Sequence, residues 1–199
     1  MTPSWIDLIG IGSSSASGTS IVGITGMGEA KRRRAGRAGA PAPAASEFFG
    51  EDWNAASKPA IVPGKSCGSC TKCCKLMGIP ELKKRAWEEC PHVAPGLGCK
   101  IYSERPRSCR SFICGWLLDP YMGPDLKPEN CHVVFYQRGE HHIVGTCDAD
   151  YPDAWRKPNV IEFLHRLAKA NAPHRKVILM EKNRTWFITE NAIVPADTG

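Results

Sequence analysis

Cys67-Gly-Ser-Cys70-Thr-Lys-Cys73-Cys74 places four cysteines within eight residues. Thiols this crowded are better placed to hold a metal than to pair with one another, because a gap of two residues lets one tight turn aim two thiolates at the same ion. Four more cysteines follow within the next forty residues, namely Cys90, Cys99, Cys109 and Cys114. This stretch predicts a lobe whose fold and chemistry both depend on a metal or a cluster.

The spacing of the first group leaves the kind of metal open. Cys67, Cys70 and Cys73 repeat a two-residue gap that begins bacterial ferredoxin motifs, whereas Cys74 is not part of that pattern. If the segment is helical, Cys67, Cys70 and Cys74 share one face and Cys73 points elsewhere, so adjacent cysteines can serve different sites. The second group has looser gaps, which indicate separate loops ordered by metal and favour zinc. The cofactor is therefore zinc or an iron-sulfur cluster.

Charged and polar neighbours accompany the cysteines. Cations near a polythiolate would offset its negative charge, although such residues are also ordinary surface residues. His92 is a minor candidate ligand, because a single histidine in a loop is more often exposed or hydrogen-bonded. The neighbouring cations are Lys72, Lys75, Lys100, Arg105, Arg107 and Arg110.

The cysteine pattern resembles the CxxCxxCC family of zinc- or iron-chelating domains, also called YkgJ-like cysteine cluster proteins. The resemblance rests on the first cysteine group, on Cys90-Pro91, and on the segment Cys99-Lys-Ile-Tyr102-Ser-Glu-Arg105-Pro106-Arg-Ser-Cys109-Arg110-Ser-Phe112-Ile-Cys114. It implies that eight cysteines bind metal together, namely Cys67, Cys70, Cys73, Cys74, Cys90, Cys99, Cys109 and Cys114. It also implies that the site is shaped by Tyr102, Arg105, Pro106, Arg110 and Phe112.

Two classes of function follow. The first is a non-enzymatic metal-binding module with a structural, sensing or partner-binding role. The second comes from a branch of the same family that is associated with lysine methylation of flagellin, and it implies an iron-sulfur-dependent enzyme that modifies protein side chains. The sequence carries no dinucleotide fingerprint and no nucleophile elbow, so it predicts no catalytic residue and leaves enzyme activity open.

The first fifty residues differ in composition from the rest of the chain. Small residues and prolines such as Ala40-Pro-Ala-Pro-Ala-Ala45 predict a disordered tail over residues 1–50, followed by a single domain over 51–199. Met27 begins a segment typical of a protein N-terminus, so residues 1–26 could lie upstream of the true start. The basic run from Lys31 to Arg34, with Arg37, could bind nucleic acid weakly, but no aromatic residues accompany it to stack on bases.

The net charge, the N-terminal sequence and the cysteine content indicate the kind of binding partner and the cellular compartment. The formal net charge of +6 counts every cysteine as neutral, and each zinc site of four thiolates would subtract about two charges. No basic residue precedes an apolar stretch at the N-terminus, and no segment reaches the length of a membrane span. We expect a cytoplasmic protein with reduced thiols and an unidentified protein partner, rather than a secreted disulfide scaffold or a membrane protein.

The remaining sequence predicts a scaffold for the cysteine lobe. Residues 81–89 contain good helix formers, and residues 158–170 place Val160, Phe163, Leu164 and Leu167 at helical spacing. Residues 132–138 and 141–146 predict a hairpin about Gly139, and residues 176–180 and 185–189 predict a second hairpin.

The position of the first hairpin turn predicts where the last two cysteines lie, and the composition predicts the fold class. A turn centred on Gly139 would set Cys131 opposite Cys147, as a buried cross-strand pair or a reserve dithiol. The 19 glycines and 16 prolines favour a loop-rich fold that needs local staples. The predicted class is α+β: a small loop-rich cysteine lobe stapled by metal, supported by two β-hairpins and one amphipathic helix.

Overall fold

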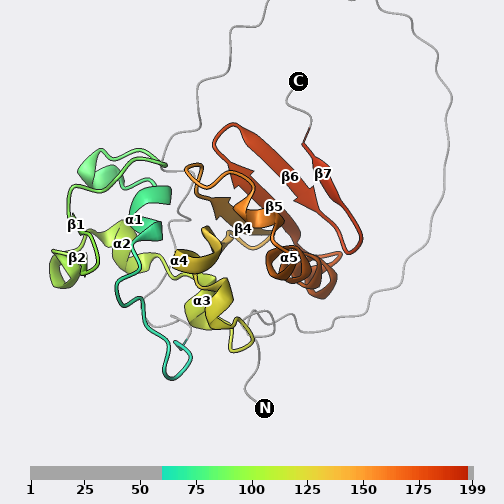
Figure 1. Cartoon of the computed structure of the whole chain (residues 1–199), viewed down its shortest axis with the longest axis horizontal. Helices are drawn as coiled ribbons and strands as arrows, with labels where there is room; N and C mark the ends of the chain where they lie inside the picture. The colour runs from blue at the N-terminus through green and yellow to red at the C-terminus, as the bar shows by residue number, and fades with distance from the viewer. Residues whose placement is uncertain (1–59, 197–199) are drawn as a thin grey trace, which may run out of the picture.

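A computed structural model of the chain describes residues 60–196. A lobe of short helices and loops lies beside a sheet that carries one long helix (Figure 1). No helix within the described part of the chain is long and apolar enough to cross a bilayer. The predicted tail, its basic run and the alternative start at Met27 lie outside the described residues.

One mixed sheet of five strands, in the order β3-β4-β5-β6-β7, forms the scaffold. The β3–β4 and β5–β6 pairs are antiparallel hairpins, which confirms both predicted hairpins. They join into one sheet because β4 and β5 pair in parallel, with helix α5 (Pro158–Asn171) in the crossover between them. The strands are β3 (Val133–Arg138), β4 (His142–Cys147), β5 (Lys176–Glu181), β6 (Arg184–Ile188) and β7 (Ile193–Pro195).

The helix α5 confirms the predicted amphipathic helix. Pro158 occupies the first turn, where its missing N–H costs no intrahelical hydrogen bond. All four predicted apolar positions are buried, and the Phe163 ring meets the Phe135 ring of β3 edge-on with centroids 5.0 Å apart. The apolar stripe of α5 therefore covers one face of the sheet.

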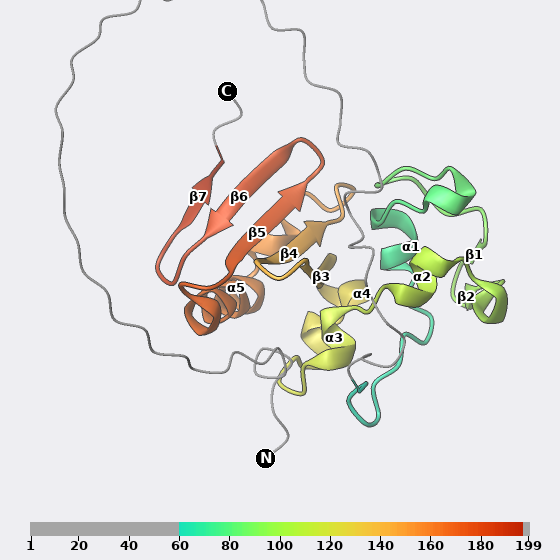
Figure 2. The same ribbon diagram turned by 180° about the vertical axis from the view of Figure 1, so that it is seen from behind.

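The other face of the sheet packs against the cysteine lobe. Side chains alternate along a strand, so Val133 and Phe135 of β3 join the core beneath α5, whereas Val134 and Tyr136 join a second core cluster. Leu76 of helix α1 (Lys72–Leu76) belongs to that second cluster. The sheet is therefore the middle layer between α5 and the lobe, which Figure 2 shows from behind.

The lobe consists of short elements joined by loops, as the composition predicts. Its only strands within residues 60–132 are β1 and β2, which pair antiparallel. The elements that precede the sheet, besides α1, are η3 (Pro80–Leu82), β1 (Val93–Ala94), β2 (Gly98–Cys99), η4 (Tyr102–Glu104), α2 (Arg107–Ser111), α3 (Gly115–Leu118), η5 (Pro124–Leu126) and α4 (Pro128–Cys131), and η6 (Ala154–Arg156) precedes α5.

The predicted helix over residues 81–89 is wrong. The short 3-10 helix η3 ends at Leu82, and both Lys83 and Trp87 have positive φ. Lys84 instead forms an isolated bridge with Ile79, and its buried ammonium donates to the backbone carbonyl of Met77 at 2.5 Å. These tertiary contacts override the helix propensity of the segment.

The predicted pairing of Cys131 with Cys147 is also wrong. The turn is centred one residue later than Gly139, so Cys147 lies opposite Val133, and Cys131 lies in α4. Both thiols are nevertheless buried in the core beneath α5, with exposures of 0% and 1%. Burial raises the pKa of Cys131 to about 11, which suits a packing role for this thiol.

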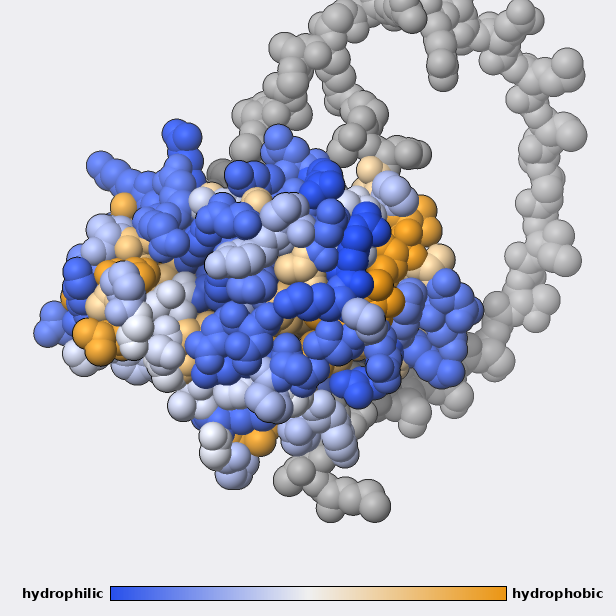
Figure 3. Space-filling view, viewed as in Figure 1, coloured by the Kyte–Doolittle hydropathy of each residue, from blue (hydrophilic) through white to orange (hydrophobic). Residues whose placement is uncertain are grey.

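Apolar side chains are exposed at several places on the surface, and two of these places involve β-strands. Leu97 is 85% exposed between β1 and β2, and Phe187 of β6 pairs with Val194 of β7 at the edge of the sheet. Figure 3 shows apolar surface over both regions and a largely hydrophilic surface between them.

Candidate metal centre

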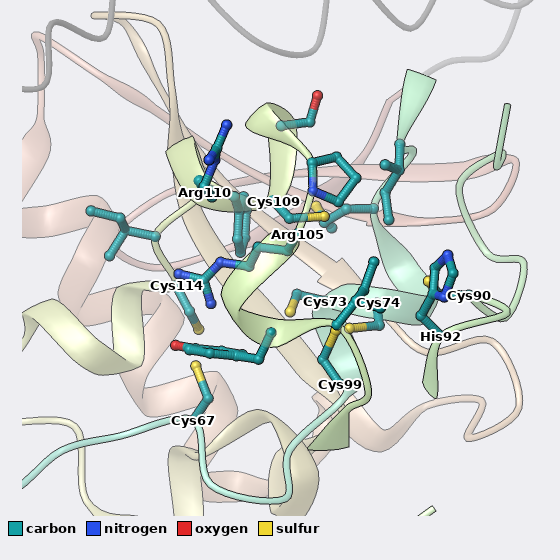
Figure 4. A pocket seen from close by; sticks show the side chains of 18 of the residues that line it. Cys67, Cys73, Cys74, Cys90, His92, Cys99, Arg105, Cys109, Arg110 and Cys114 are labelled. Atoms are coloured by element: carbon teal, nitrogen blue, oxygen red, sulfur yellow. The ribbon is translucent and has the colours of Figure 1, made fainter. Parts of the chain in front are cut away.

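A cavity of about 340 Å³ inside the lobe brings together the cysteines that the sequence singles out. Figure 4 shows how several of their sulfur atoms gather around it. They come from the turn before α1, from α1 itself, from the loop before β1, from β2, from α2 and from the residue before α3. The lining includes Cys67, Cys70, Cys73, Cys74, Cys90, Cys99, Cys109 and Cys114.

The turn before α1 sets the first pair of thiols. The backbone N–H of Cys70 donates to the carbonyl of Cys67 at 3.0 Å, and Gly68 supplies the positive φ of 56° that this turn requires. Cys73 and Cys74 follow in α1, where adjacent residues point about 100° apart around the axis. Their side chains therefore leave the helix in different directions, although the two thiols still form a hydrogen bond with each other.

A tight approach of two loops positions Cys99. Val93 of β1 pairs with Cys99, and Ala94 pairs with Gly98. A Cβ at Gly98 would lie 3.1 Å from the carbonyl oxygen of Gly68, and the φ of Gly98 is 98°. The loop that carries Cys99 therefore rests directly on the turn that carries Cys67.

The thiols share the cavity without standing in ligating positions. Among residues 60–196, no three Cys, His, Asp or Glu side chains form a group that could hold an ion in this conformation. All ten cysteines are free, so no disulfide fixes the lobe. The donor set fits zinc or an iron-sulfur cluster by its chemistry, because soft thiolates are the ligands that both prefer.

Burial dominates the electrostatics of most of these thiols. It raises the pKa of Cys109 to about 11 and that of Cys114 to about 12. The Cys73 and Cys74 thiols interact directly: a hydrogen bond to Cys74 raises the pKa of Cys73, and the same bond lowers the pKa of Cys74. Cys74 is thus the thiol most ready to ionise among those four.

Arg105 and Tyr102 line the cavity together, as the family resemblance implies. The Arg105 guanidinium lies over the Tyr102 ring, 3.9 Å from its centroid, and its Nε is buried without a hydrogen-bond partner. Burial raises the pKa of Cys67, and the Arg105 charge counteracts that rise. Arg105 therefore supplies positive charge where thiolates would form.

The other predicted residues also lie on the cavity wall. Phe112 additionally meets the Tyr136 ring of β3 at 5.5 Å in an edge-on contact, which links α2 to the sheet. Of the predicted cations, four do not line the cavity, namely Lys72, Lys75, Lys100 and Arg107. The predicted residues that do are His92, Pro106, Arg110 and Phe112.

Lys72 and Lys75 form ion pairs with a carboxylate that the sequence does not single out, that of Asp148. Their ammonium groups lie 2.6 and 2.7 Å from the two carboxylate oxygens of Asp148, whose side chain is fully buried. This buried ion pair, the Asp148 latch, joins α1 to the end of β4. Asp148 lies far from both lysines in sequence, so no local pattern could have indicated the pairing.

Lys127 and Glu81 are two further supporting residues that the sequence does not single out. The positive charge of Lys127 acts against the burial that raises the pKa of Cys70. The Glu81 carboxylate accepts hydrogen bonds from the backbone N–H and the hydroxyl of Ser108, at 2.9 and 2.7 Å. This contact fixes the start of α2, the helix that carries Cys109.

Comparison of the chain with known protein families, with curated proteins and with solved structures finds no match in any of the three.

Proposed function

We propose that this protein is a metal-binding module, in which the eight cysteines of the lobe hold zinc or an iron-sulfur cluster. The observation that carries the proposal is the selective gathering of these thiols. Eight of the ten cysteines line one cavity, whereas Cys131 and Cys147 lie in the core beneath α5. Thiols that serve packing alone would have no reason to converge from several short loops on one space.

The surroundings of the cavity support the same proposal. The short elements of the lobe bury little of their own surface, so they gain order from any ligand that links them. Arg105 and Lys127 bring positive charge to thiols that would become thiolates on binding metal. Metal would therefore fix the lobe against the sheet, for a structural, sensing or partner-binding role.

A matched pair of variants tests the proposal on the full chain purified without oxygen or chelator. Cys90→Ala removes a buried thiol of the cavity, and Cys131→Ala removes a buried thiol of the sheet core. We expect Cys90→Ala to lose bound metal, and Cys131→Ala to keep the full metal content while losing about 1 kcal/mol of stability. Full metal content in the folded Cys90→Ala protein would contradict the proposal.

One observation favours a second candidate function, an iron-sulfur-dependent enzyme that modifies protein side chains in the manner of a lysine methylase. The cavity volume of about 340 Å³ falls in the range of small-molecule sites, and Leu82 and Ile101 give it apolar walls. Iron and sulfide in the purified protein are necessary for this candidate. A colourless protein that binds zinc and takes up no iron would remove it.

A further inference from the structure

A second, smaller cavity touches only half of the eight thiols. It has a volume of about 20 Å³, which suits an occupant of about the size of one water molecule. Trp116, Lys127 and Val134 complete its wall on the side of the sheet. Its cysteines are Cys67, Cys70, Cys73 and Cys114.

The contacts with the sheet divide the thiols in the same way. Cys73 and Cys114 pack against the core cluster formed by Leu76, Val134 and Tyr136. Within the described residues, no other cavity cysteine packs against this cluster. The thiols that line the smaller cavity thus lie on the sheet side of the lobe, and the remaining four lie toward β1, β2 and α2.

The adjacent pair Cys73-Cys74 lies at the boundary between the two groups. Cys73 lines both cavities, whereas Cys74 lines only the larger one. Four thiolates per divalent ion also leave each centre with a charge that Lys127 and Arg105 can offset.

From the two cavities, the sheet contacts and the place of Cys73-Cys74 at the boundary between the cavities, we infer that the eight cysteines form two separate metal centres of four thiolates each. The inference rests on the proposed function and assigns its ligands. The inner centre, on the sheet side, takes Cys67, Cys70, Cys73 and Cys114. The outer centre takes Cys74, Cys90, Cys99 and Cys109.

Alkylation of the full-length protein at partial zinc loading tests this division without any mutation. The metal-free, reduced protein receives one equivalent of zinc, is treated with iodoacetamide under native conditions, and is weighed intact. We expect the cavity thiols to be labelled in steps of four, and fragment masses to place Cys73 and Cys74 in different sets. Molecules that carry either all eight labels or none would overturn the division, because they indicate one shared centre.

Paired variants give an independent readout, the zinc capacity of the chain. We expect Cys67→Ser with Cys114→Ser, both in the inner centre, to halve the zinc capacity. Cys109→Ser with Cys114→Ser, one from each centre, should abolish it. Loss of all zinc in the inner-centre double variant while the outer four thiols remain would contradict the division. A wild-type chain whose thiols are protected neither by zinc nor by reconstitution with iron and sulfide would instead overturn the proposed function itself.

Discussion

Asp148 is the residue whose contacts most directly join the cysteine helix to the sheet. Its buried carboxylate accepts from Lys72 and Lys75, which lie on either side of Cys73 and Cys74 in α1. We predict that Asp148→Asn lowers the free energy of unfolding by about 2 kcal/mol, because two charge-assisted contacts lose their negative partner. Denaturant unfolding at pH 7 measures this loss.

Asp150 provides the matched control for that change. It pairs with the same Lys75, but its side chain is 66% exposed. A surface pair of this kind contributes less than about 1 kcal/mol, so Asp150→Asn should leave stability nearly unchanged. Equal losses in the two variants would contradict a role for the buried latch.

The Asp148 latch also predicts how stability depends on pH. Burial would raise the pKa of Asp148, but the hydrogen bonds from Lys72 and Lys75 outweigh it and hold the pKa below the ordinary value. A carboxylate with a lowered folded pKa stabilises the fold above its unfolded pKa of about 3.9, and this contribution is lost as the pH falls through the folded pKa. The stability gap between wild type and Asp148→Asn should therefore close in acid, and a gap independent of pH would refute this origin.

Gly98 tests the close approach between the two cysteine loops. An added Cβ would meet the Gly68 carbonyl at 3.1 Å, whereas a Cβ at Gly96 would meet nothing within 4 Å. Both glycines have positive φ, so both alanine variants carry backbone strain, and only Gly98→Ala also pushes the Cys99 loop from the Cys67 turn. We predict a loss of zinc affinity about tenfold larger for Gly98→Ala, equal to about 1.4 kcal/mol, in a competition titration. Equal affinities for the two variants would contradict this.

At the scale of single residues, the sequence predicts the members of the cavity but not their supports. The eight cysteines and Arg105 lie close together in sequence, so spacing and family resemblance suffice to group them. Lys127 lies just before α4 and Asp148 just after β4, so both lie outside the cysteine-rich stretch of the sequence and meet the lobe only in the folded chain. Contacts of that range follow from the tertiary fold, which no local pattern encodes.

Helices α1 and α5 lie on opposite faces of the sheet, and only α1 carries cysteines of the cavity. Truncation of one leucine in each helix separates their effects on stability from their effects on zinc binding. Leu76 of α1 lies in the cluster beside the cysteine lobe, and Leu167 of α5 lies in the opposite core, both at 1% exposure or less. Truncation of either to alanine should cost about 3 kcal/mol of stability. We predict that Leu76→Ala also weakens zinc binding, because α1 carries Cys73 and Cys74, whereas Leu167→Ala does not.

The measurement for this pair is zinc affinity under conditions where both variants remain folded, checked by circular dichroism. Equal zinc affinities in Leu76→Ala and Leu167→Ala would show that the packing of α1 does not position its thiols. That result would leave the cavity in place but remove the sheet as its support.

The elements of the second half were the most predictable part of the fold. Alternating and helical apolar periods are local signals, and they place α5 and both hairpins correctly. The parallel pairing of β4 with β5 was not predicted, because strand periodicity does not say which edges meet. The helix predicted over residues 81–89 does not form, because the buried contacts of Lys84 stabilise a non-helical backbone more than helix propensity stabilises a helix.

At the scale of the whole molecule, metal binding by the lobe would be coupled to proton release. Burial, or for Cys73 chiefly its hydrogen bond to Cys74, raises the pKa of five cavity thiols, namely Cys67, Cys70, Cys73, Cys109 and Cys114. These thiols are protonated at pH 7, and each must lose a proton to become a metal ligand. Zinc affinity should therefore fall as the pH falls, because protons compete with zinc for the same sulfur atoms.

Calorimetry in buffers of different ionisation enthalpy checks this prediction. We expect saturation with zinc at pH 7 to release about five protons or more per chain. A binding enthalpy that does not vary with the buffer would mean that no proton leaves, and would contradict thiol ligation.

Metal content and thiol reactivity, measured on one sample of the full chain purified without oxygen or chelator, test whether the lobe binds metal. We predict bound zinc, or iron with sulfide, in a folded protein whose eight cavity thiols react with iodoacetamide only after a chelator removes the metal. A folded protein that contains no metal, takes up neither zinc nor iron with sulfide, and exposes those thiols to immediate labelling would contradict it.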